Sequence, residues 1–419
     1  MHINLGSNAI TTKQQNVSLI KQVIYKYGPI SRSEIAKMLS LTPAAITINI
    51  NDMIARGFVH ELGENTGRRN NENESSVSGR KPIDIDVIAK ASHFVGVEIA
   101  TGKLYAVLAD LKGQTVASID QKSDHTDYMY IINQATDVVS KLISDAGLKK
   151  EDIGGMCVSS PGFVDPVQGV IRNFGRYNWE NKSLARDIFE YTGIQVTIEN
   201  NARARAVGED LFGNGKRLDT FVYLFVSKGI ACPMMIRNNG FAGVTTGAGE
   251  VGHMVMALDG PKCAGCGNHG CLEAFSSETA IINFCTEAMK REKTILSELA
   301  ADPDSPTLDE ILEASACGDM AVQSILTTSI RYLAVALANI IRFISPRQVI
   351  VDAYIMKRQE NRDYFTEYLH RNFYGVNNLN FTLEFKECDK FSGAKGAAAV
   401  AINKFFVMDD KLISACASK

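Results

Sequence analysis

A chain of 419 residues is too long for one hydrophobic core of ordinary size, so we expect two or three domains. Its hydrophobic fraction of 45%, charged fraction of 22% and formal net charge of −3 are typical of a soluble globular protein. Residues 1–16 lack the apolar core of a secretory signal, and no apolar run approaches the roughly 18 residues of a membrane span. We therefore expect a cytoplasmic protein with no membrane partner.

The charge is unevenly distributed along the chain. Residues 1–82 contain ten Lys and Arg against six Asp and Glu, a net charge of +4, which leaves −7 for the remainder. A basic head on an acidic body indicates a polyanionic partner for the head, such as a nucleic acid. An excess of this size also arises by chance.

The head begins with two predicted helices. Apolar residues at helical spacing over 17–24 predict the first helix, which Gly28-Pro29 ends. Ser31, followed three residues later by Glu34, forms a capping box, so a second helix starts there and runs to about residue 38. Residues 39–41 then form a short turn.

A third helix is predicted directly after this turn. Thr42 is a favourable N-cap, and Pro43 fits the first helical position. The helix ends near Gly57, and the segment 58–64 reads as a strand. Two short helices around a three-residue turn, followed by a strand, predict a winged helix-turn-helix. The alternative is a helical pair used for dimerisation.

A winged helix-turn-helix places its second helix in the major groove of DNA. The first residues of that helix would meet base edges, and Ala and Thr methyl groups suit the methyl groups of thymine. The residues concerned are Pro43, Ala44, Ala45, Thr47 and Ile48. Ser31, Arg32 and Thr42 are placed for phosphate groups.

The segment 63–82 is polar, contains glycine and lacks periodicity, which predicts a flexible linker or a long wing. Its basic residues either reach DNA or are solvated linker charges; they are Arg68, Arg69, Arg80 and Lys81. We place the boundary near residue 85, which gives a DNA-binding domain over 1–85 and a body over 86–419.

The body reads as two cycles of strands and helices. Alternating apolar runs after residue 92 predict a meander of three strands, followed by a helix over 128–146 and a buried strand over 154–160. A helix near 183–192 and a strand before Asn200 complete the first cycle, and a second cycle begins at Thr220. Two such cycles predict two α/β lobes. The apolar segment 324–345 is either a buried core helix or part of a dimer interface.

Three of the nine cysteines lie close together. The odd total of nine cysteines in a chain of this length argues against a disulfide framework. A Cys₃His set is typical of a closed tetrahedral zinc site, which leaves no open position for water and is therefore structural. The predicted ligands are His253, Cys263, Cys266 and Cys271. His269 is a competing fourth ligand, and the alternative is three reduced surface thiols.

Around this motif the sequence resembles the ROK family (repressor, open reading frame, kinase). The family pattern Gly-His, then Cys-x-Cys-Gly-x₂-Gly-Cys-x-Glu, reads here as Gly252-His253 and then CAGCGNHGCLE over 263–273, with one extra residue between the first two cysteines. The resemblance covers nearly the whole chain. It is greatest with the repressor members, such as the xylose and N-acetylglucosamine repressors.

This resemblance implies an actin/hexokinase-like body with two ribonuclease-H-like lobes. It also implies a monosaccharide effector, an operator DNA partner and a homodimer or homotetramer. The implied sugar contacts are Asn200, Asn201, Glu250, His253 and Glu273. Amides and carboxylates suit this role because each can form paired hydrogen bonds with vicinal hydroxyls.

The resemblance further indicates that catalysis is lost. Family kinases use the Asp of an Asn-Asp pair as general base, and the corresponding Asn201 cannot accept a proton. The first phosphate loop, Asp-x-Gly-x-Thr-Lys, reads here as EIATGK over 98–103. The second, Gly-Thr-Gly-x-Gly, reads as SKGIA over 227–231, and a late Gly-Gly is Asp352-Ala353.

We therefore predict a repressor whose body binds a sugar without phosphorylating it and whose head then releases operator DNA. One alternative is an ATP-dependent hexose or N-acetylhexosamine kinase with a regulatory DNA-binding head. The other is a zinc-dependent DNA-binding switch with no small ligand.

Overall fold

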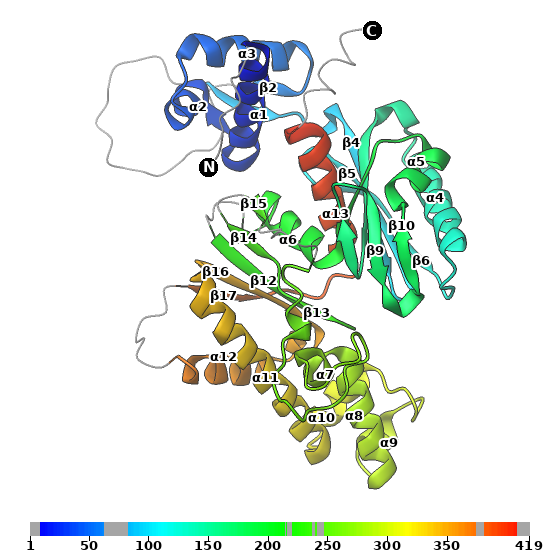
Figure 1. Cartoon of the computed structure of the whole chain (residues 1–419). Helices are drawn as coiled ribbons and strands as arrows, with labels where there is room; N and C mark the ends of the chain where they lie inside the picture. Colours follow the sequence, from blue (N-terminus) through cyan, green and yellow to red (C-terminus); the bar gives the residue numbers. More distant parts are fainter. Residues whose placement is uncertain are drawn as a thin grey trace. The chain divides into compact units, whose positions relative to one another are not determined.

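A computed structural model describes residues 9–62, 83–213, 215, 220–236, 239–240, 247–373 and 381–408 (Figure 1). These residues belong to two compact units. The first draws on Met1–Arg172, Trp179–Arg217 and Phe391–Lys419, and the second on Asn173–Asn178 and Leu218–Lys390. Each unit contains one large β-sheet with helices packed against it.

The first unit opens with three helices, as the sequence predicts: α1 (Ala9–Tyr27), α2 (Arg32–Leu39) and α3 (Pro43–Ala55). The Ser31 hydroxyl accepts from the Glu34 N–H while the Glu34 carboxylate accepts from the Ser31 N–H, so the predicted capping box is confirmed. The Thr42 hydroxyl accepts from the Ala45 N–H at 3.3 Å and caps α3. Both helix starts are therefore fixed by side chains within four residues of the cap.

A three-stranded antiparallel sheet completes this head. Its order is β1-β3-β2, formed by β1 (Ile30–Ser31), β3 (Asp84–Val87) and β2 (Val59–Leu62). Strand β2 confirms the strand predicted after Gly57. The boundary predicted near residue 85 falls inside β3, so the sheet of the head continues to Val87. The segment 63–82, with its four basic residues, lies outside the described residues.

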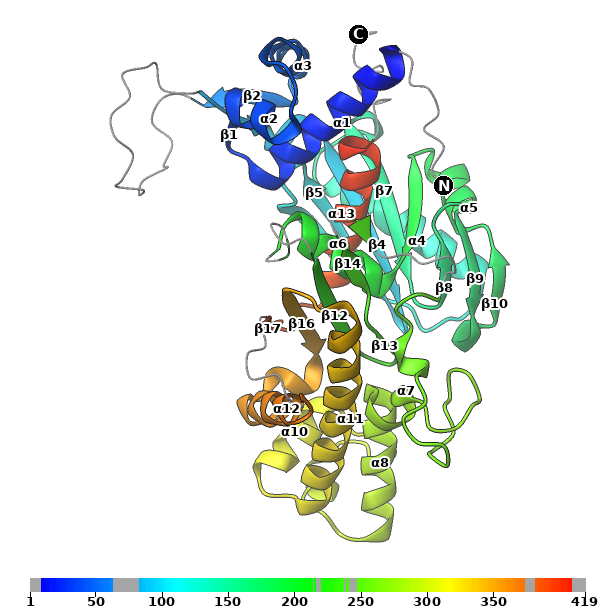
Figure 2. The ribbon, with the colours of Figure 1, turned by 60° about the vertical axis from the view of Figure 1, so that its left-hand side comes forward.

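The C-terminal end of the described chain packs into the core of the head. The π-helix η7 (Asn403–Val407) follows α13 (Ser392–Ile402), and its Phe406 is buried against Phe58 and Tyr25 at ring-centroid distances of 5.2 and 5.8 Å. The Lys21 ammonium of α1 donates to the Phe406 carbonyl at 3.0 Å. Figure 2 shows α13 ending beside α1. Head and first lobe therefore share one hydrophobic cluster.

The large sheet of the first unit has the order β11-β7-β4-β5-β6. The strands are β4 (His93–Ala100), β5 (Lys103–Asp110), β6 (Thr115–Lys122), β7 (Ile153–Ser160) and β11 (Val196–Asn200). Strands β4, β5 and β6 form the predicted antiparallel meander, whereas β7 and β11 run parallel to β4. The carboxyl ends of β4, β7 and β11 therefore meet at one edge of the sheet.

Helices cover both faces of this sheet (Figure 1). Helices α4 (Tyr128–Asp145) and α5 (Leu184–Thr192) lie on one face, and α6 (Asn201–Leu211) packs with α13 on the other. Gly96 in β4 permits the close approach of α13, since a β-carbon there would lie 2.0 Å from the Ala394 carbonyl oxygen. Helix α13 thus contacts β4, β7 and α6 directly.

A second, small sheet has the order β10-β9-β8, with β8 (Phe163–Asp165), β9 (Val170–Phe174) and β10 (Trp179–Lys182). Trp179, the only tryptophan, is buried here. Its ring meets Tyr128 edge-on at 5.1 Å, and its indole N–H donates to the Thr126 carbonyl at 2.9 Å. Trp179 therefore belongs to the core of the first lobe.

The sheet of the second unit has the order β15-β14-β12-β16-β17, and β13 also pairs with β12. The strands are β12 (Thr220–Val226), β13 (Ile230–Ala231), β14 (Met234–Ile236), β15 (Asn239–Gly240), β16 (Gln348–Ala353) and β17 (Thr382–Phe385). Strands β12, β16 and β17 are parallel, while β13 and β14 turn back antiparallel to β12. This arrangement repeats the mixed sheet of the first unit.

The helices of the second unit follow the loop that carries Cys263, Cys266 and Cys271. They are α7 (Leu272–Ser276), α8 (Glu278–Arg291), α9 (Leu296–Leu299), α10 (Leu308–Ala316), α11 (Met320–Ile344) and α12 (Gln359–Arg371). Helix α11 is long and apolar enough to cross a membrane by length and composition alone, yet over half of its most apolar window is buried in the protein. It packs against α7, α8 and α12. Of the two predictions for 324–345, the structure supports the core helix.

Candidate functional site

Four predicted metal ligands come together in the second unit. The ligand atoms of His253, Cys263, Cys266 and Cys271 all lie within 4.8 Å of one another. The Cys266 and Cys271 sulfurs are 3.6 Å apart, and the Cys263 sulfur is 3.8 Å from His253 Nδ1. A tetrahedron of ligands about 2.3 Å from a zinc ion has edges of about 3.8 Å. The donor set and its spacing therefore fit a tetrahedral zinc ion.

The competing ligand His269 lies outside this cluster. Its Nδ1 is 3.0 Å from the Gly260 carbonyl oxygen, and its ring is exposed. Its backbone forms an isolated bridge with Lys262, which shapes the loop around the cysteines. Gly270 closes this loop at φ +73°, where a β-carbon would collide with the Ala257 carbonyl. His269 therefore supports the loop, and His253 is the fourth candidate ligand.

Two of the thiols are held in their neutral form when no cation is bound. Burial raises the pKa of Cys271 to about 12, and burial also raises the pKa of Cys263. Zinc binds thiolates, so binding would release protons from these two residues. The backbone N–H groups of Gly265 and Cys266 point to the Cys263 sulfur and would stabilise its thiolate.

Three of the predicted sugar contacts lie beside this cluster. Glu250 is the N-cap of the short 3₁₀ helix η5 (Val251–His253), which places it one turn before His253. Glu273, in the first turn of α7, approaches both His253 and the glycine loop at Gly229, where a β-carbon would lie 3.1 Å from its carboxylate. Burial raises the pKa of Glu273. Glu250, His253 and Glu273 thus come from neighbouring segments of the second unit.

The other two predicted sugar contacts lie in the first unit, where β11 ends and α6 begins. Asn200 is buried and caps α6: its side-chain oxygen accepts from the N–H groups of Ala202 and Arg203, and its amide nitrogen donates to Gly162. The Asn201 side-chain oxygen also accepts from Ala202 N–H, at 3.0 Å. Within the described chain the Asn201 amide nitrogen has no partner. Of the two amides, Asn201 is the one free to donate.

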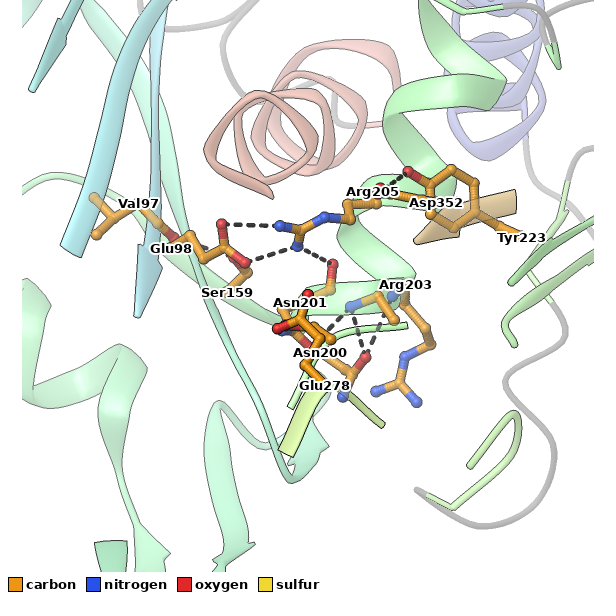
Figure 3. A network of polar contacts seen from close by, with 12 residues as sticks. Val97, Glu98, Ser159, Asn200, Asn201, Arg203, Arg205, Tyr223, Glu278 and Asp352 are labelled. Atoms are coloured by element: carbon orange, nitrogen blue, oxygen red, sulfur yellow. Dashed lines mark hydrogen bonds and ion pairs between the residues drawn. The ribbon is translucent and has the colours of Figure 1, made fainter. Parts of the chain in front are cut away.

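A buried ion pair occupies the position of the first predicted phosphate loop. Arg205 of α6 donates to the two carboxylate oxygens of Glu98 at 2.7 and 3.2 Å (Figure 3). The same guanidinium donates to the Asn201 carbonyl at 3.3 Å. Glu98 lies near the end of β4 and Arg205 about one turn into α6, so sequence spacing gave no signal for this pair. The pair joins the segment 98–103 to the backbone of Asn201, the residue that the resemblance aligns with the kinase base.

In the second unit, carboxylates stand at the other two segments that the resemblance aligns with phosphate loops, 227–231 and 352–353. Asp352 of β16 accepts from the Tyr223 hydroxyl at 2.7 Å (Figure 3). Glu278, the first residue of α8, accepts from the Ser227 hydroxyl at 3.3 Å, and burial raises its pKa to about 7. Partial burial of the Lys228 ammonium, together with Arg176, lowers the pKa of Lys228. A carboxylate at the Gly-Gly position would repel a nucleotide phosphate.

The first turns of α3, which the sequence predicts to contact DNA bases, are exposed on the surface of the head. The exposed residues at the start of α3 are Thr42, Pro43, Ala44, Thr47 and Ile48. Ile48 is 64% exposed, so its side chain lies on the surface of α3 and not in the core of the head. The Thr47 hydroxyl donates to the Pro43 carbonyl at 2.8 Å, so its methyl group faces away from that bond.

The predicted phosphate contacts on α2 are less available than their sequence positions suggested. Ser31 is 1% exposed, and its hydroxyl is engaged with Glu34, so it acts as a helix cap. Arg32 forms an ion pair with Glu61 of β2 and donates to Asn51. Because Glu61 and Asn51 are distant in sequence, local pattern could not predict either bond. Arg68, Arg69, Arg80 and Lys81 lie outside the described residues.

Comparison with known proteins places this architecture in a family. The ROK family profile matches residues 94–404, and the chain belongs to the ROK family. Over 339 residues it is 27% identical to the xylose repressor of Bacillus subtilis (strain 168), an alignment that covers 81% of this chain and 82% of that repressor.

Two solved structures share the fold. A ROK family transcriptional regulator, a homologue of the Escherichia coli Mlc protein, has a TM-score of 0.79 at 23% identity and covers 97% of this chain and 98% of its own. A ROK family glucokinase from Streptomyces griseus in complex with glucose and AMPPNP has a TM-score of 0.66 at 22% identity. It covers 74% of this chain and 99% of its own. The fold is thus common to regulators and kinases.

Proposed function

We propose that this protein is a cytoplasmic, sugar-responsive transcriptional repressor. Its head binds operator DNA, and its kinase-like body binds a monosaccharide or a derivative without transferring a phosphate group. Membership of the ROK family, the likeness to a xylose repressor and the fold shared with a transcriptional regulator support this proposal. The observation that supports the non-catalytic part of the proposal most strongly is the residue in place of the kinase base.

That residue is Asn201. A sugar kinase needs a group that accepts the proton of the attacked hydroxyl, and a carboxamide has no such basicity. The Asn201 oxygen already accepts a backbone N–H, which leaves its amide nitrogen to donate to a sugar oxygen. Arg205 holds Glu98 in a buried pair at the first phosphate loop. Both features favour binding over catalysis.

The proposed sugar contacts are Asn201, Glu250, His253 and Glu273, with Asn200 positioning Asn201 as the cap of α6. Zinc bound through His253 Nδ1 would fix the imidazole and leave Nε2 to donate a hydrogen bond. The carboxylates of Glu250 and Glu273 accept from sugar hydroxyls. In this proposal the zinc ion is structural, because four protein ligands leave it no open position.

The proposed DNA contacts lie at the start of α3. Pro43, Ala44 and Thr47 meet base edges, while Thr42 and Arg32 approach phosphates. To contact a phosphate, Arg32 gives up its ion pair with Glu61. We propose a homodimer or homotetramer that presents two such helices to half-sites about one helical turn apart. The effector acts by binding the DNA-releasing state more tightly than the DNA-bound state.

A thermal-shift screen tests the proposal. The full-length protein is heated with monosaccharides, their phosphates or ATP, and a ligand specific to the folded state raises the melting temperature. The proposal expects one sugar or a close derivative to raise it and ATP to leave it unchanged.

The same samples are then incubated with ATP and each sugar, and phosphorylated sugar is measured. Sugar-dependent phosphate transfer would contradict the proposal and favour an ATP-dependent hexose or N-acetylhexosamine kinase, in keeping with the glucokinase fold. Release of DNA by a metal chelator alone, together with no effect of any sugar on the melting temperature, would favour the zinc-dependent switch.

A further inference from the structure

A cation-lined cavity lies in the second unit, next to the proposed sugar contact Glu273. Its volume is about 130 Å³. The residues that matter for its chemistry are Arg176, Lys228, Lys262, Glu273, Ser277 and Thr279. The cavity provides on the order of ten times the space that one water molecule requires. It is smaller than the roughly 300 Å³ at which pockets for drug-sized ligands begin. It therefore suits a small group rather than a whole nucleotide.

Three cations converge on this cavity from separate parts of the chain. Arg176 lies in the 3₁₀ helix η3 (Gly175–Tyr177), Lys228 in the turn between β12 and β13, and Lys262 in the loop that carries the cysteines. Within the described residues none of the three side chains forms an ion pair or a hydrogen bond. Unpaired like charges around one cavity repel each other, and a bound anion would offset that repulsion.

The N-terminus of α8 forms another part of the wall. Ser277 caps this 14-residue helix by accepting from the Ala280 N–H at 3.1 Å, and the Glu278 N–H donates to the Ser227 carbonyl. In the described chain the backbone N–H and the hydroxyl of Thr279 have no partner. The partial positive charge of a helix N-terminus favours an anion, and here it supplements three side-chain cations with one free N–H group, that of Thr279.

Two carboxylates belong to these surroundings, Glu273 in the cavity wall and Glu278 beside it. Arg176 interacts electrostatically with Glu273, and Lys228 with Glu278, but neither pair lies within ion-pair distance. Glu278 accepts from the Ser227 hydroxyl, and burial raises its pKa to about 7, so it carries only about half a negative charge at neutral pH. Glu273 is directed to Gly229 and His253. The cavity thus keeps a positive balance along the side formed by Arg176, Lys228 and Lys262.

We propose that this cavity binds the phosphate group of a phosphorylated sugar, so that the effector is a sugar phosphate. A phosphate monoester carries a charge of about −1.5 to −2 at pH 7 and offers three acceptor oxygens. Arg176 can engage two of these oxygens at once, and the two lysines act as point charges. Since Glu273 lines the cavity and is also a proposed sugar contact, the sugar carrying the phosphate would reach Glu273.

A sugar ester fits this surrounding better than a nucleotide does. The Asp352 carboxylate stands at the position of the family's late glycine pair, and Glu98 is paired with Arg205 at the first phosphate loop. The inference rests on the proposed function, because it names the chemical class of the effector for the same body. It adds a role for three cations that neither the DNA-binding head nor the zinc cluster uses.

Calorimetric titration of the full-length protein tests the inference. The probes are inorganic phosphate, a set of hexoses, the 6-phosphates of the same hexoses, and AMP. Wild type is compared with Lys228→Gln, Arg176→Gln and, as a matched control, Lys290→Gln at the other end of α8. Losing one charge-assisted hydrogen bond costs about tenfold or more in affinity.

We expect a hexose 6-phosphate to bind more tightly than its free hexose. We also expect Lys228→Gln and Arg176→Gln to weaken that binding at least tenfold while Lys290→Gln leaves it unchanged. Equal affinity of all variants, tighter binding of the free hexose, or tighter binding of AMP would overturn the inference. Operator binding is measured on the same samples: if it persists while phosphate specificity fails, the inference falls and the proposed repressor function stands.

Discussion

Replacing Arg205 with methionine should destabilise the first unit, because the Glu98 carboxylate would stay buried without its partner. The two side chains are 9% and 3% exposed, and two hydrogen bonds of 2.7 and 3.2 Å join them. Breaking a buried, hydrogen-bonded ion pair from one side costs about 3–5 kcal/mol. The guanidinium also donates to the Asn201 carbonyl, so the first turn of α6 should loosen as well.

Urea unfolding of the full-length protein, followed by far-ultraviolet circular dichroism, measures this loss. Glu98→Gln combined with Arg205→Met should recover much of it, because no unpaired charge remains. Arg186→Met is the matched control: Arg186 is 68% exposed and pairs with Asp187, so its loss should cost less than about 1 kcal/mol. A cost below 1 kcal/mol for Arg205→Met, or a double variant as unstable as the sum of the single variants, would refute the reasoning.

Metal analysis should find one zinc ion per chain in wild type and in His269→Gln, and none in Cys271→Ser; zinc lost from His269→Gln would mean that the ligand set is wrong. Phe406→Ala should lower the free energy of unfolding by about 3–5 kcal/mol, because the buried ring packs on Phe58. Faster hydrogen exchange in α1 would report this loss, and unchanged exchange there would contradict the shared core. Burial raises the pKa of Glu278 to about 7, so the stabilisation from its neutral form is complete below the unfolded value of about 4.3 and is lost as pH rises through 7. The free energy of unfolding of Glu278→Gln, measured in urea, should therefore rise relative to that of wild type by up to about 3 kcal/mol between pH 5 and pH 8. A difference between the two proteins that does not change with pH would show that Glu278 is ionised throughout.

Features of this protein that depend on neighbours in sequence were predictable. The capping box of Ser31 with Glu34, and Thr42 before Pro43, fixed both helix starts of the head within one turn. The close spacing of the cysteines predicted that they meet, and the structure brings Cys263, Cys266 and Cys271 together with a histidine. Local signals suffice there because each interaction closes a short loop.

Features that depend on long-range pairing were missed. The residues of β3 alternate between polar and apolar, but this short run does not specify that β3 pairs with β1 and β2. Phe406 enters the core of the head from nearly 350 residues beyond Phe58. The partner of Glu98 is likewise 107 residues away, at Arg205. One sequence does not specify such contacts, because many cations and aromatic residues would satisfy the same local pattern.

The availability of side chains also required the structure. Ser31 and Arg32 had the right positions for phosphate contacts, but Ser31 is a buried cap and Arg32 is paired with Glu61. Asn200 and Asn201 look equivalent in the sequence. In the structure Asn200 uses both ends of its amide, whereas Asn201 keeps its nitrogen free. Burial and hydrogen bonding, which a sequence does not display, therefore decide between residues of the same type.

Operator binding measured together with effector binding tests the central claim most directly. Full-length protein selects duplexes from a random DNA pool, and fluorescence anisotropy then gives the affinity for the selected duplex with and without the ligand found by thermal shift. The account predicts a duplex with two half-sites about one helical turn apart, release when the ligand is added, and no phosphorylated product in the presence of ATP. A ligand that is phosphorylated, or that leaves the affinity for DNA unchanged, would contradict it.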